Sequence, residues 1–483
     1  MYFFSYPEAD NDLWGHLFFG REISVSGTIP ARNTYSFTAP EHPWVNHEWL
    51  AEVIFWGIYS GLGSSGLILL KTLVAAGVLW VLNLTLKHFV LSSMSRLVAQ
   101  FWLMVLLSPG FNVRPQIFTL LSFAAVLFLL HRSEVLGAKL LFQIVPLTAL
   151  WVNLHGGVVA GLGALATFTG FKLVARGEKK AKTQTAVSLL LSLMVLSLNP
   201  YGLRLVTFLA SDLFIDRAIS EWRPIPLLGA SFLGFKLAIL CFASFSWRNQ
   251  AWQRWDFWLA VVAGVLAFRH QRHTPLFAIA AAPLLAQGLE HMWRLARQRI
   301  GEVVRGRAWP CFVGGLLFAG VYQLYAIGRI HWEHRFRIVV SPFEYPTQAV
   351  QFLQRNGIRG NLAVPFDWGE YFIWKLYPES RVSIDGRYTT AYPMKVIQDS
   401  WAWMEGQRSW KNLEERYAAE VAITNRLHPV TALLRRDPEW VYIYSDPVAF
   451  VFVRKVAALQ PVLEKFQSKS LVPPSAPPIY FPG

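Results

Sequence analysis

The chain of 483 residues is 54% hydrophobic and 15% aromatic, and only 16% of its residues are charged. So few polar side chains cannot cover a core of this size in water, which excludes an ordinary soluble enzyme and predicts a polytopic membrane protein. The formal net charge is +15, but the basic residues fall between apolar segments, where membrane topology and anionic lipid explain them better than nucleic acid does. We therefore expect membrane lipid, and no nucleic acid, among its partners.

An acidic stretch near the amino terminus, Glu8–His16, holds three carboxylates and an imidazole within nine residues. Asp10 and Asp12 lie two residues apart in a segment without regular periodicity. Both side chains can therefore reach one site, as a general base beside an orienting or cation-holding carboxylate requires. The alternative is that Asn11 or Asp12 caps a short helix that runs from Leu13 towards Glu22, and local propensity favours this cap.

Prolines interrupt residues 1–65, which we interpret as an exterior acidic and interfacial loop region. A second polar and aromatic cluster, Pro43–Trp49, includes His47 and Glu48. These two residues either shape an acceptor pocket or accompany the neighbouring tryptophans as interfacial anchors. They are not the zinc-protease helix motif, because the residue one turn after His47 is Ala51 rather than a second histidine.

Apolar runs then follow one another through a predicted transmembrane helical domain, residues 66–328. Several runs are shorter than the roughly 20 residues that a bilayer requires, and re-entrant hairpins would remove spans in pairs. We predict about ten spans, at 66–86, 97–109, 116–130, 138–152, 156–175, 184–198, 226–246, 256–268, 274–290 and 310–328.

The connections between these runs differ in charge. Lysine and arginine are concentrated in 176–183 and 291–309 and in the other connections of the same side, which the positive-inside rule assigns to the cytoplasm. The opposite connections then face the exterior, together with the acidic stretch and everything after residue 328. These exterior connections hold polar clusters with Arg114, Asn153, His155, Glu221, Arg223, Arg269, Arg272 and His273.

From about residue 342 the composition becomes that of a globular domain, and we predict a small exterior α/β domain over 342–456. The expected helix is Pro346–Asn356, which Gly357 ends. The expected strands are Asn361–Pro365, Arg381–Ile384, Glu420–Thr424, Trp440–Ser445 and Ala449–Arg454.

Two polar turns, Phe366–Gly369 and Ile384–Arg387, follow strands of this domain. Each is either an ordinary turn, which is the commoner case, or part of an acceptor site. The five prolines in 471–483 predict a disordered extended tail.

Seven short motifs occur along the chain in the order EADNDLWGH, PWVNHEW, RPQ, WVNLHGG, LNPYG, EWRP and RHQRHTPLF. In this order they resemble bacterial glycosyltransferases of the GT-C superfamily, and most closely the branch of the dolichyl-phosphate-mannose protein mannosyltransferases. The resemblance covers most of the chain and implies an inverting transferase that takes its sugar from a polyprenyl-phosphate carrier at the outer face. It maps the family's acidic motif onto Asp10 and Asp12. Family members also have a spanning helix before this motif, which the resemblance would place upstream of residue 1.

The predicted fold is therefore mainly α, a GT-C-like transmembrane bundle followed by a small α/β domain, in a bacterial inner or plasma membrane. Asp10 or Asp12 is the expected general base. Arg269 and Arg272, at i and i+3 on one helical face, would hold the donor phosphate with His273 as a third donor, unless they only extend to lipid headgroups. We assign no metal ligand, and a divalent cation is an optional cofactor. The expected acceptor or pocket residues are His16, His47, Glu48, Arg114, Asn153, His155, Glu221 and Arg223.

The expected partners are a polyprenyl-phosphate-linked sugar and a glycan, lipid or protein acceptor. Two other functions are compatible with a chain of this kind. A transporter or lipid flippase would hold its substrate near the bilayer midplane, whereas the ionisable residues here gather at one edge. A non-catalytic membrane anchor would use only its exterior domain, to bind a partner. The His155-Gly156-Gly157 motif has a structural alternative too, since paired glycines commonly permit close helix packing.

Overall fold

The computed structural model describes residues 2–90, 92–212, 219–299, 302–476 and 478–483. These residues form two compact units, which we call the helical unit and the mixed unit. The helical unit consists of residues 1–6 and 68–333, and the mixed unit consists of residues 7–67 and 334–483. The fold is mainly helical, with one small sheet.

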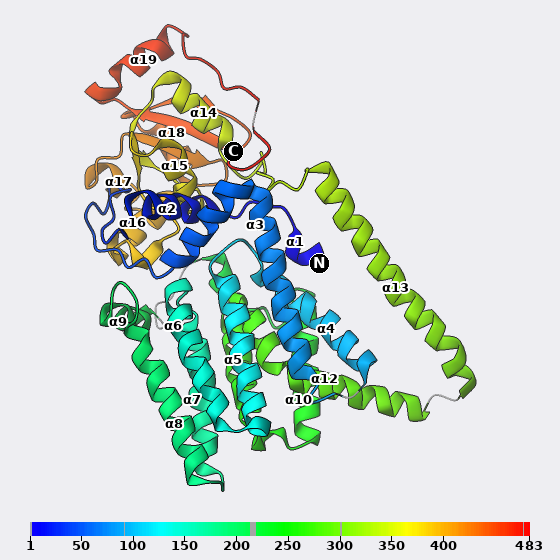
Figure 1. Cartoon of the computed structure of the whole chain (residues 1–483). Helices are drawn as coiled ribbons and strands as arrows, with labels where there is room; N and C mark the ends of the chain where they lie inside the picture. Colours follow the sequence, from blue (N-terminus) through cyan, green and yellow to red (C-terminus); the bar gives the residue numbers. More distant parts are fainter. Residues whose placement is uncertain (1, 91, 213–218, 300–301, 477) are drawn as a thin grey trace. The chain divides into compact units, whose positions relative to one another are not determined.

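The helical unit contains most of the long helices of the chain, many of which Figure 1 labels. Helix α5 packs beside α7, and α7 packs beside α8. The Lys-rich connection from α7 to α8 follows the end of α7, whereas residues 155–157 precede its start, so the two lie at opposite ends of α7. Its longer helices are α4 (Ser93–Leu107), α5 (Gln116–Leu136), α6 (Ile144–Leu154), α7 (Val158–Val174), α8 (Lys179–Met194), α9 (Leu203–Asp212), α10 (Leu233–Arg248), α11 (Trp255–Arg269), α12 (Thr274–Arg299) and α13 (Glu302–Glu333).

Helix α12 is the core of this unit. It packs against α4, α5, α10 and α11, and its apolar side chains between Phe277 and Ala286 are almost completely buried. Five of these side chains are alanines, which allow neighbouring helices to approach closely.

Each of the ten apolar segments predicted from the sequence overlaps a helix. Two described helices, α3 (Trp49–Leu86) and α5, are long and apolar enough to cross a membrane by length and composition, and the segments Ala138–Leu154 and Val158–Val174 are apolar but shorter. A helix of 15–17 residues is about 22–26 Å long, which is less than the roughly 30 Å of a hydrocarbon core. The polytopic bundle of ten spans therefore stays a prediction.

Helix α3 belongs to both units, because Gly63 interrupts it with φ 62° and ψ −160°. A residue with a Cβ rarely adopts this backbone conformation, so glycine permits the kink. The part before the kink lies in the mixed unit and the part from Ile68 onward in the helical unit. Residues 1–65, predicted as loop, thus contain the start of α3 as well as helix α2 (Leu13–Ser26).

The mixed unit is built on a five-stranded sheet of order β2-β1-β3-β5-β4. Strand β1 is parallel to β2 and β3, whereas β5 is antiparallel to β3 and β4. The strands lie within one or two residues of their predicted positions, which confirms those predictions. They are β1 (Gly360–Ala363), β2 (Ser380–Val382), β3 (Val421–Asn425), β4 (Trp440–Ser445) and β5 (Ala449–Arg454).

Short helices surround this sheet. Helix α14 ends where predicted, at Gly357, which closes the helix with φ 65°. Helix α15 packs against both α2 and β2, so it joins the amino-terminal segment to the sheet. The helices are α14 (Thr347–Asn356), α15 (Gly369–Leu376), α16 (Met394–Met404), α17 (Asn412–Glu415), α18 (Val430–Arg436) and α19 (Gln460–Gln467).

The last residues of the chain pack against the mixed unit instead of forming the disordered tail that the prolines predicted. Tyr480 pairs with Val339 in a β-bridge, and the buried Phe481 contacts the ring of Trp14. The Trp14 indole donates a hydrogen bond to the carbonyl of Pro482 at 2.8 Å. The prediction was wrong because proline removes local backbone donors but leaves aromatic side chains and carbonyls available for contacts distant in sequence.

Candidate active site

Asp12 stands at the start of α2, as the capping interpretation expected, but its side chain makes no cap hydrogen bond. Its backbone is already helical, with φ −84° and ψ −7°, whereas a capping residue normally adopts an extended conformation. Asp10 supports the turn, because its Oδ1 accepts a hydrogen bond from the N–H of Asp12 at 3.1 Å. The Asp12 carboxylate therefore does not cap its own helix.

The carboxyl group of Glu370, in the first turn of α15, lies near that of Asp12. Two glycines, Gly386 and Gly15, line the space that this pair occupies. A Cβ at Gly386 would lie 2.7 Å from Asp12 Oδ1 and 2.8 Å from Glu370 Oε1. A Cβ at Gly15 would overlap Glu370 Oε2. Only glycine at these two positions leaves room for the pair, so α2, α15 and the turn after β2 together form this carboxyl pair.

Glu370 is only 5% exposed, and its Oε2 has no hydrogen-bond partner among the residues that the structure describes. Burial raises the pKa of Glu370 well above its usual range, and the negative charges of Asp12 and Asp385 raise it further. The raised pKa favours the neutral form of the Glu370 carboxyl beside Asp12. Two carboxyls that share a site in this way can divide the roles of base and neutral acid.

The turn Ile384–Arg387 holds Gly386 next to the carboxyl groups of Asp12 and Glu370. Arg387 donates to Asp385 from Nε at 2.8 Å and from Nη2 at 2.7 Å, and Nη2 also donates to Asn33 Oδ1 at 2.9 Å. The guanidinium lies over the rings of Phe19, Trp44 and Tyr35, at 4.9, 4.7 and 5.0 Å from their centroids. Because Asp385 and Arg387 are buried, these contacts favour the structural interpretation of this turn over direct binding of an acceptor.

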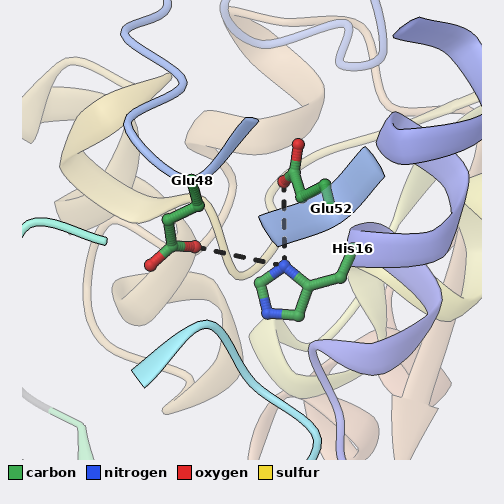
Figure 2. A group of neighbouring side chains, drawn as sticks. All are labelled: His16, Glu48 and Glu52. Atoms are coloured by element: carbon green, nitrogen blue, oxygen red, sulfur yellow. Dashed lines mark ion pairs between the residues drawn. The ribbon is translucent and has the colours of Figure 1, made fainter. Parts of the chain in front are cut away.

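A separate group of donors surrounds the imidazole of His16, one helical turn after Asp12 (Figure 2). His16 Nδ1 lies 3.7 Å from Glu52 Oε1 and 4.0 Å from Glu48 Oε2. Burial lowers the pKa of His16, but the contact with Glu52 and the charges of Glu48, Glu52 and Asp12 outweigh it, so the pKa is raised. In the described part of the chain, the ring nitrogen of His16 and the carboxylate oxygens of Glu48 and Glu52 are close enough together to hold a metal ion.

The helical unit holds the other predicted site residues. Arg114 Nη1 donates to Glu221 Oε1 at 2.7 Å, which pairs two of them. The guanidinium of Arg272 lies 4.9 Å from the ring centroid of Trp222, and His270 Nδ1 lies 2.8 Å from the carbonyl of Trp222. Contacts thus connect the loops around residues 114, 222 and 272.

Arg269 and Arg272 do not share one helical face. Helix α11 ends at Arg269, whose side chain is exposed, and Arg272 lies in the following 3-10 turn, Gln271–His273. The prediction failed because helical spacing was extended past the end of the helix. Burial and then the Arg272 charge lower the pKa of His273 to about 4, so its ring is neutral at pH 7.

The remaining predicted residues of this unit make local contacts. Asn153 Nδ2 donates to the carbonyls of Ala149 and Leu198, each at 2.9 Å, and Arg223 is exposed. His155 Nδ1 lies 2.8 Å from Thr119 Oγ1 and accepts the N–H of Gly157 at 2.9 Å. These contacts favour the structural interpretation of the paired glycines.

The structure therefore distributes the predicted residues over the two units. Asp10, Asp12, His16, His47 and Glu48 lie in the mixed unit, and the other eight lie in the helical unit. Sequence reasoning missed Glu370, because a single glutamate in an amphipathic segment carries no signal. It also missed Glu52, although the spacing of Glu48 and Glu52, four residues apart, was a usable sign.

Comparison with protein-family models and with curated proteins finds no match for this chain. Among solved structures, it is similar to the oligosaccharyltransferase of Archaeoglobus fulgidus in the apo form. The TM-score is 0.53 at 12% identity, over 86% of this chain and 66% of the other. The structure of that enzyme tethered to an acceptor peptide with an NVT sequon gives a TM-score of 0.52 at 11% identity, over 93% and 70%.

At this level of identity the likeness concerns the fold alone. The fold is similar to that of this archaeal oligosaccharyltransferase, which agrees with the GT-C-like fold predicted from the sequence. The chain spans about two thirds of the length of the archaeal enzyme. The mannosyltransferase-like branch stays a prediction.

Proposed function

We propose that this chain is a membrane glycosyltransferase that moves a sugar from a polyprenyl-phosphate carrier to an acceptor hydroxyl, with inversion. The observation that carries the proposal is the pair of carboxyls, Asp12 and Glu370, held together at Gly386 within a GT-C fold. The acceptor class is a glycan, a lipid or a protein that bears a free hydroxyl.

In the proposed reaction, Asp12 accepts the proton of the acceptor hydroxyl as its oxygen attacks the anomeric carbon. The bond from that carbon to the carrier phosphate breaks on the opposite face, so the configuration inverts and the phosphate leaves with the electron pair. Burial and then the charge on Asp12 raise the pKa of Glu370, which favours a neutral Glu370 beside the base. Asp10 orients Asp12 through its hydrogen bond to the Asp12 N–H.

The leaving phosphate develops negative charge, and cationic donors that are already positioned stabilise it in a partly dry site. Arg269 and Arg272 are the proposed donors, because guanidinium groups suit phosphate oxygens. The ring of Trp222 supports the guanidinium of Arg272, and Arg269 is exposed at the end of α11. His273 contributes less, since a neutral ring directs its Nδ1 towards the carbonyl of Leu266 at 3.4 Å.

The membrane setting is supported by two helices of spanning length and by large apolar side chains exposed on the helical unit. On α3, for example, Leu69, Leu73 and Trp80 are 52–64% exposed. Exposed apolar surface of this extent is typical of a protein in contact with lipid or a partner. The carrier and its phosphate would then lie at the edge of the bilayer, where polar loops of the helical unit can reach them.

The proposal is tested by incubating the purified protein in lipid vesicles with radiolabelled polyprenyl-phosphate sugars and hydroxyl acceptors. We expect release of the carrier phosphate and label on the acceptor, with inverted anomeric configuration. Movement of the intact labelled lipid between leaflets, without cleavage, would instead establish the flippase alternative. Neither cleavage nor movement, with binding of a partner by the mixed unit, would establish the anchor.

A further inference from the structure

The imidazole of His16 and the carboxylates of Glu48 and Glu52 come from α2 and from the chain around the start of α3, both in the mixed unit. His16 lies in α2, Glu48 directly precedes α3, and Glu52 lies in the first turn of α3. Figure 2 shows both ion pairs meeting at one ring nitrogen, Nδ1. One nitrogen carries at most one proton, so a hydrogen bond can satisfy only one of the two carboxylates.

The two contacts of His16 are longer than hydrogen bonds, as are the looser ion pairs of the protein, such as Arg32–Glu41 at 3.8 Å. Arg114–Glu221 and Lys172–Glu134 close to 2.7 Å, whereas the two contacts of His16 stay at 3.7 and 4.0 Å. Ligand bonds of about 2.0–2.2 Å to a common ion hold their donor atoms roughly 3–3.5 Å apart. Small rotations of the two glutamates would bring all three donors to that spacing.

Each glutamate is oriented by a neighbour. Asn46 Nδ2 donates to Glu52 Oε2 at 2.6 Å, while the other oxygen of Glu52 faces His16. His47 Nε2 lies 3.5 Å from Glu48 Oε1, while the other oxygen of Glu48 faces His16. Outer partners that fix the orientation of the donors in this way are a regular feature of metal sites.

The burial and the charges of these three side chains both favour a bound cation. The side chains of His16 and Glu52 are 9% and 4% exposed, and Glu48, at 21%, leaves an approach from solvent. Two carboxyl groups face one imidazole, the Asp12 charge also acts on His16, and burial raises the pKa of Glu52, so negative charge is disfavoured in this region. Such charge is costly unless a cation compensates it.

We propose that His16, Glu48 and Glu52 bind a divalent transition-metal ion of the Zn²⁺ or Mn²⁺ class, which joins α2 to the start of α3. An imidazole donor favours these ions over Mg²⁺ and Ca²⁺, which prefer oxygen ligands alone. The bound ion fixes the helix turn that follows Asp12. The inference does not depend on the transfer reaction, because metal binding is measured directly.

The test uses the full chain without a polyhistidine tag, stripped of metal with a chelator and titrated with Zn²⁺, Mn²⁺ and Mg²⁺ by calorimetry and by elemental analysis. We expect one equivalent of Zn²⁺ or Mn²⁺, bound more tightly than Mg²⁺. Glu48→Gln and Glu52→Gln should each weaken binding by roughly 100-fold or more, because loss of outer partners alone costs about 10–100-fold. Glu48→Gln is the safer variant for folding, since Glu48 is the most exposed of the three.

Two matched variants separate this site from the carboxyl pair. Glu41→Gln removes an exposed carboxylate of the same unit and should bind the ion like the wild type. Asp12→Asn should also keep the ion, although it is expected to lose transfer. The proposal is overturned if no equivalent of ion binds, if Glu48→Gln and Glu52→Gln bind as tightly as Glu41→Gln, or if Asp12→Asn alone abolishes binding.

Discussion

At the scale of single residues, the raised pKa of Glu370 predicts how the stability of the protein depends on pH. Its pKa in the folded protein lies well above the ordinary 4.5, because burial and then the Asp12 charge oppose ionisation. Between the ordinary pKa and the raised one, the unfolded chain binds fewer protons than the folded protein. The free energy of unfolding therefore falls as the pH rises through this range. Glu370→Gln should remove this loss. Melting temperatures in chelator should therefore be higher for the variant at pH 8 and converge with the wild type near pH 4.

The same substitution should leave sugar transfer within a few-fold of the wild type, because a neutral amide resembles the protonated acid. A large loss of transfer in Glu370→Gln, with a melting temperature that falls more steeply with pH than that of the wild type, would contradict a protonated Glu370. Glu41→Gln again serves as the control for a lost carboxylate.

Residue-scale prediction from sequence succeeded where a residue type was locally unusual. Asp10 and Asp12 stand out in a chain with so few charges, and the helix start at Leu13 followed from them. The sequence could not show that the Asp12 side chain makes no cap hydrogen bond and lies near Glu370 instead. That orientation depends on Gly386 and Glu370, more than 350 residues away, and no local pattern encodes such a contact.

At the scale of elements, the contact between α15 and the turn after β2 leaves no space for a side chain at Gly369. A Cβ at Gly369, the first residue of α15, would overlap the backbone carbonyl of Ile384, which cannot rotate away as a side chain could. Gly369→Ala should therefore destabilise the mixed unit by about 1–3 kcal/mol, the usual range for overpacking. Chemical denaturation followed by circular dichroism measures this change.

Gly57→Ala provides the comparison, because a Cβ there meets no atom within 4 Å and Gly57 lies inside α3. Alanine should be neutral or should stabilise the helix by up to about 1 kcal/mol. Equal stability of Gly369→Ala and Gly57→Ala would show that α15 does not pack on the turn as described.

Elements were predicted well where periodicity or stop signals were strong, as for the five strands and for α14 with its Gly357. The carboxyl-terminal segment was predicted wrongly, since its order comes from Trp14 at the other end of the chain. The Arg269–Arg272 pair failed for a related reason: residue spacing does not reveal where α11 ends.

At the scale of the whole molecule, the charge distribution predicts topology. Residues 176–183 should lie in the cytoplasm and the mixed unit outside, by the positive-inside rule. Lys180 and Asp367 are both exposed, so each can be replaced by cysteine after Cys241 and Cys311 have been removed. A membrane-impermeant maleimide applied to intact cells should label Asp367→Cys and not Lys180→Cys, and the reverse pattern would contradict the topology.

The sequence indicated a helical bundle and a small α/β domain, but it did not predict that residues 7–67 join residues 334–483 in one compact unit. This association depends on tertiary contacts between α2 and α15 and on the kink at Gly63. The acidic stretch therefore belongs structurally to the mixed unit, which explains why a carboxyl partner of Asp12, Glu370, lies so far along the chain.

The most direct measurement of the central claim is the initial rate of sugar transfer by Asp12→Asn and Asp10→Asn against wild type and Glu41→Gln in the same vesicles. An amide keeps the shape of the carboxylate but cannot accept the hydroxyl proton, so Asp12→Asn should lower the rate by about 10²–10⁴-fold. Asp10→Asn keeps an Oδ1 that can accept the Asp12 N–H, so this variant should lower the rate less than Asp12→Asn does. Transfer by both variants at the rate of Glu41→Gln would contradict a general base in the acidic stretch and, with it, the proposed reaction.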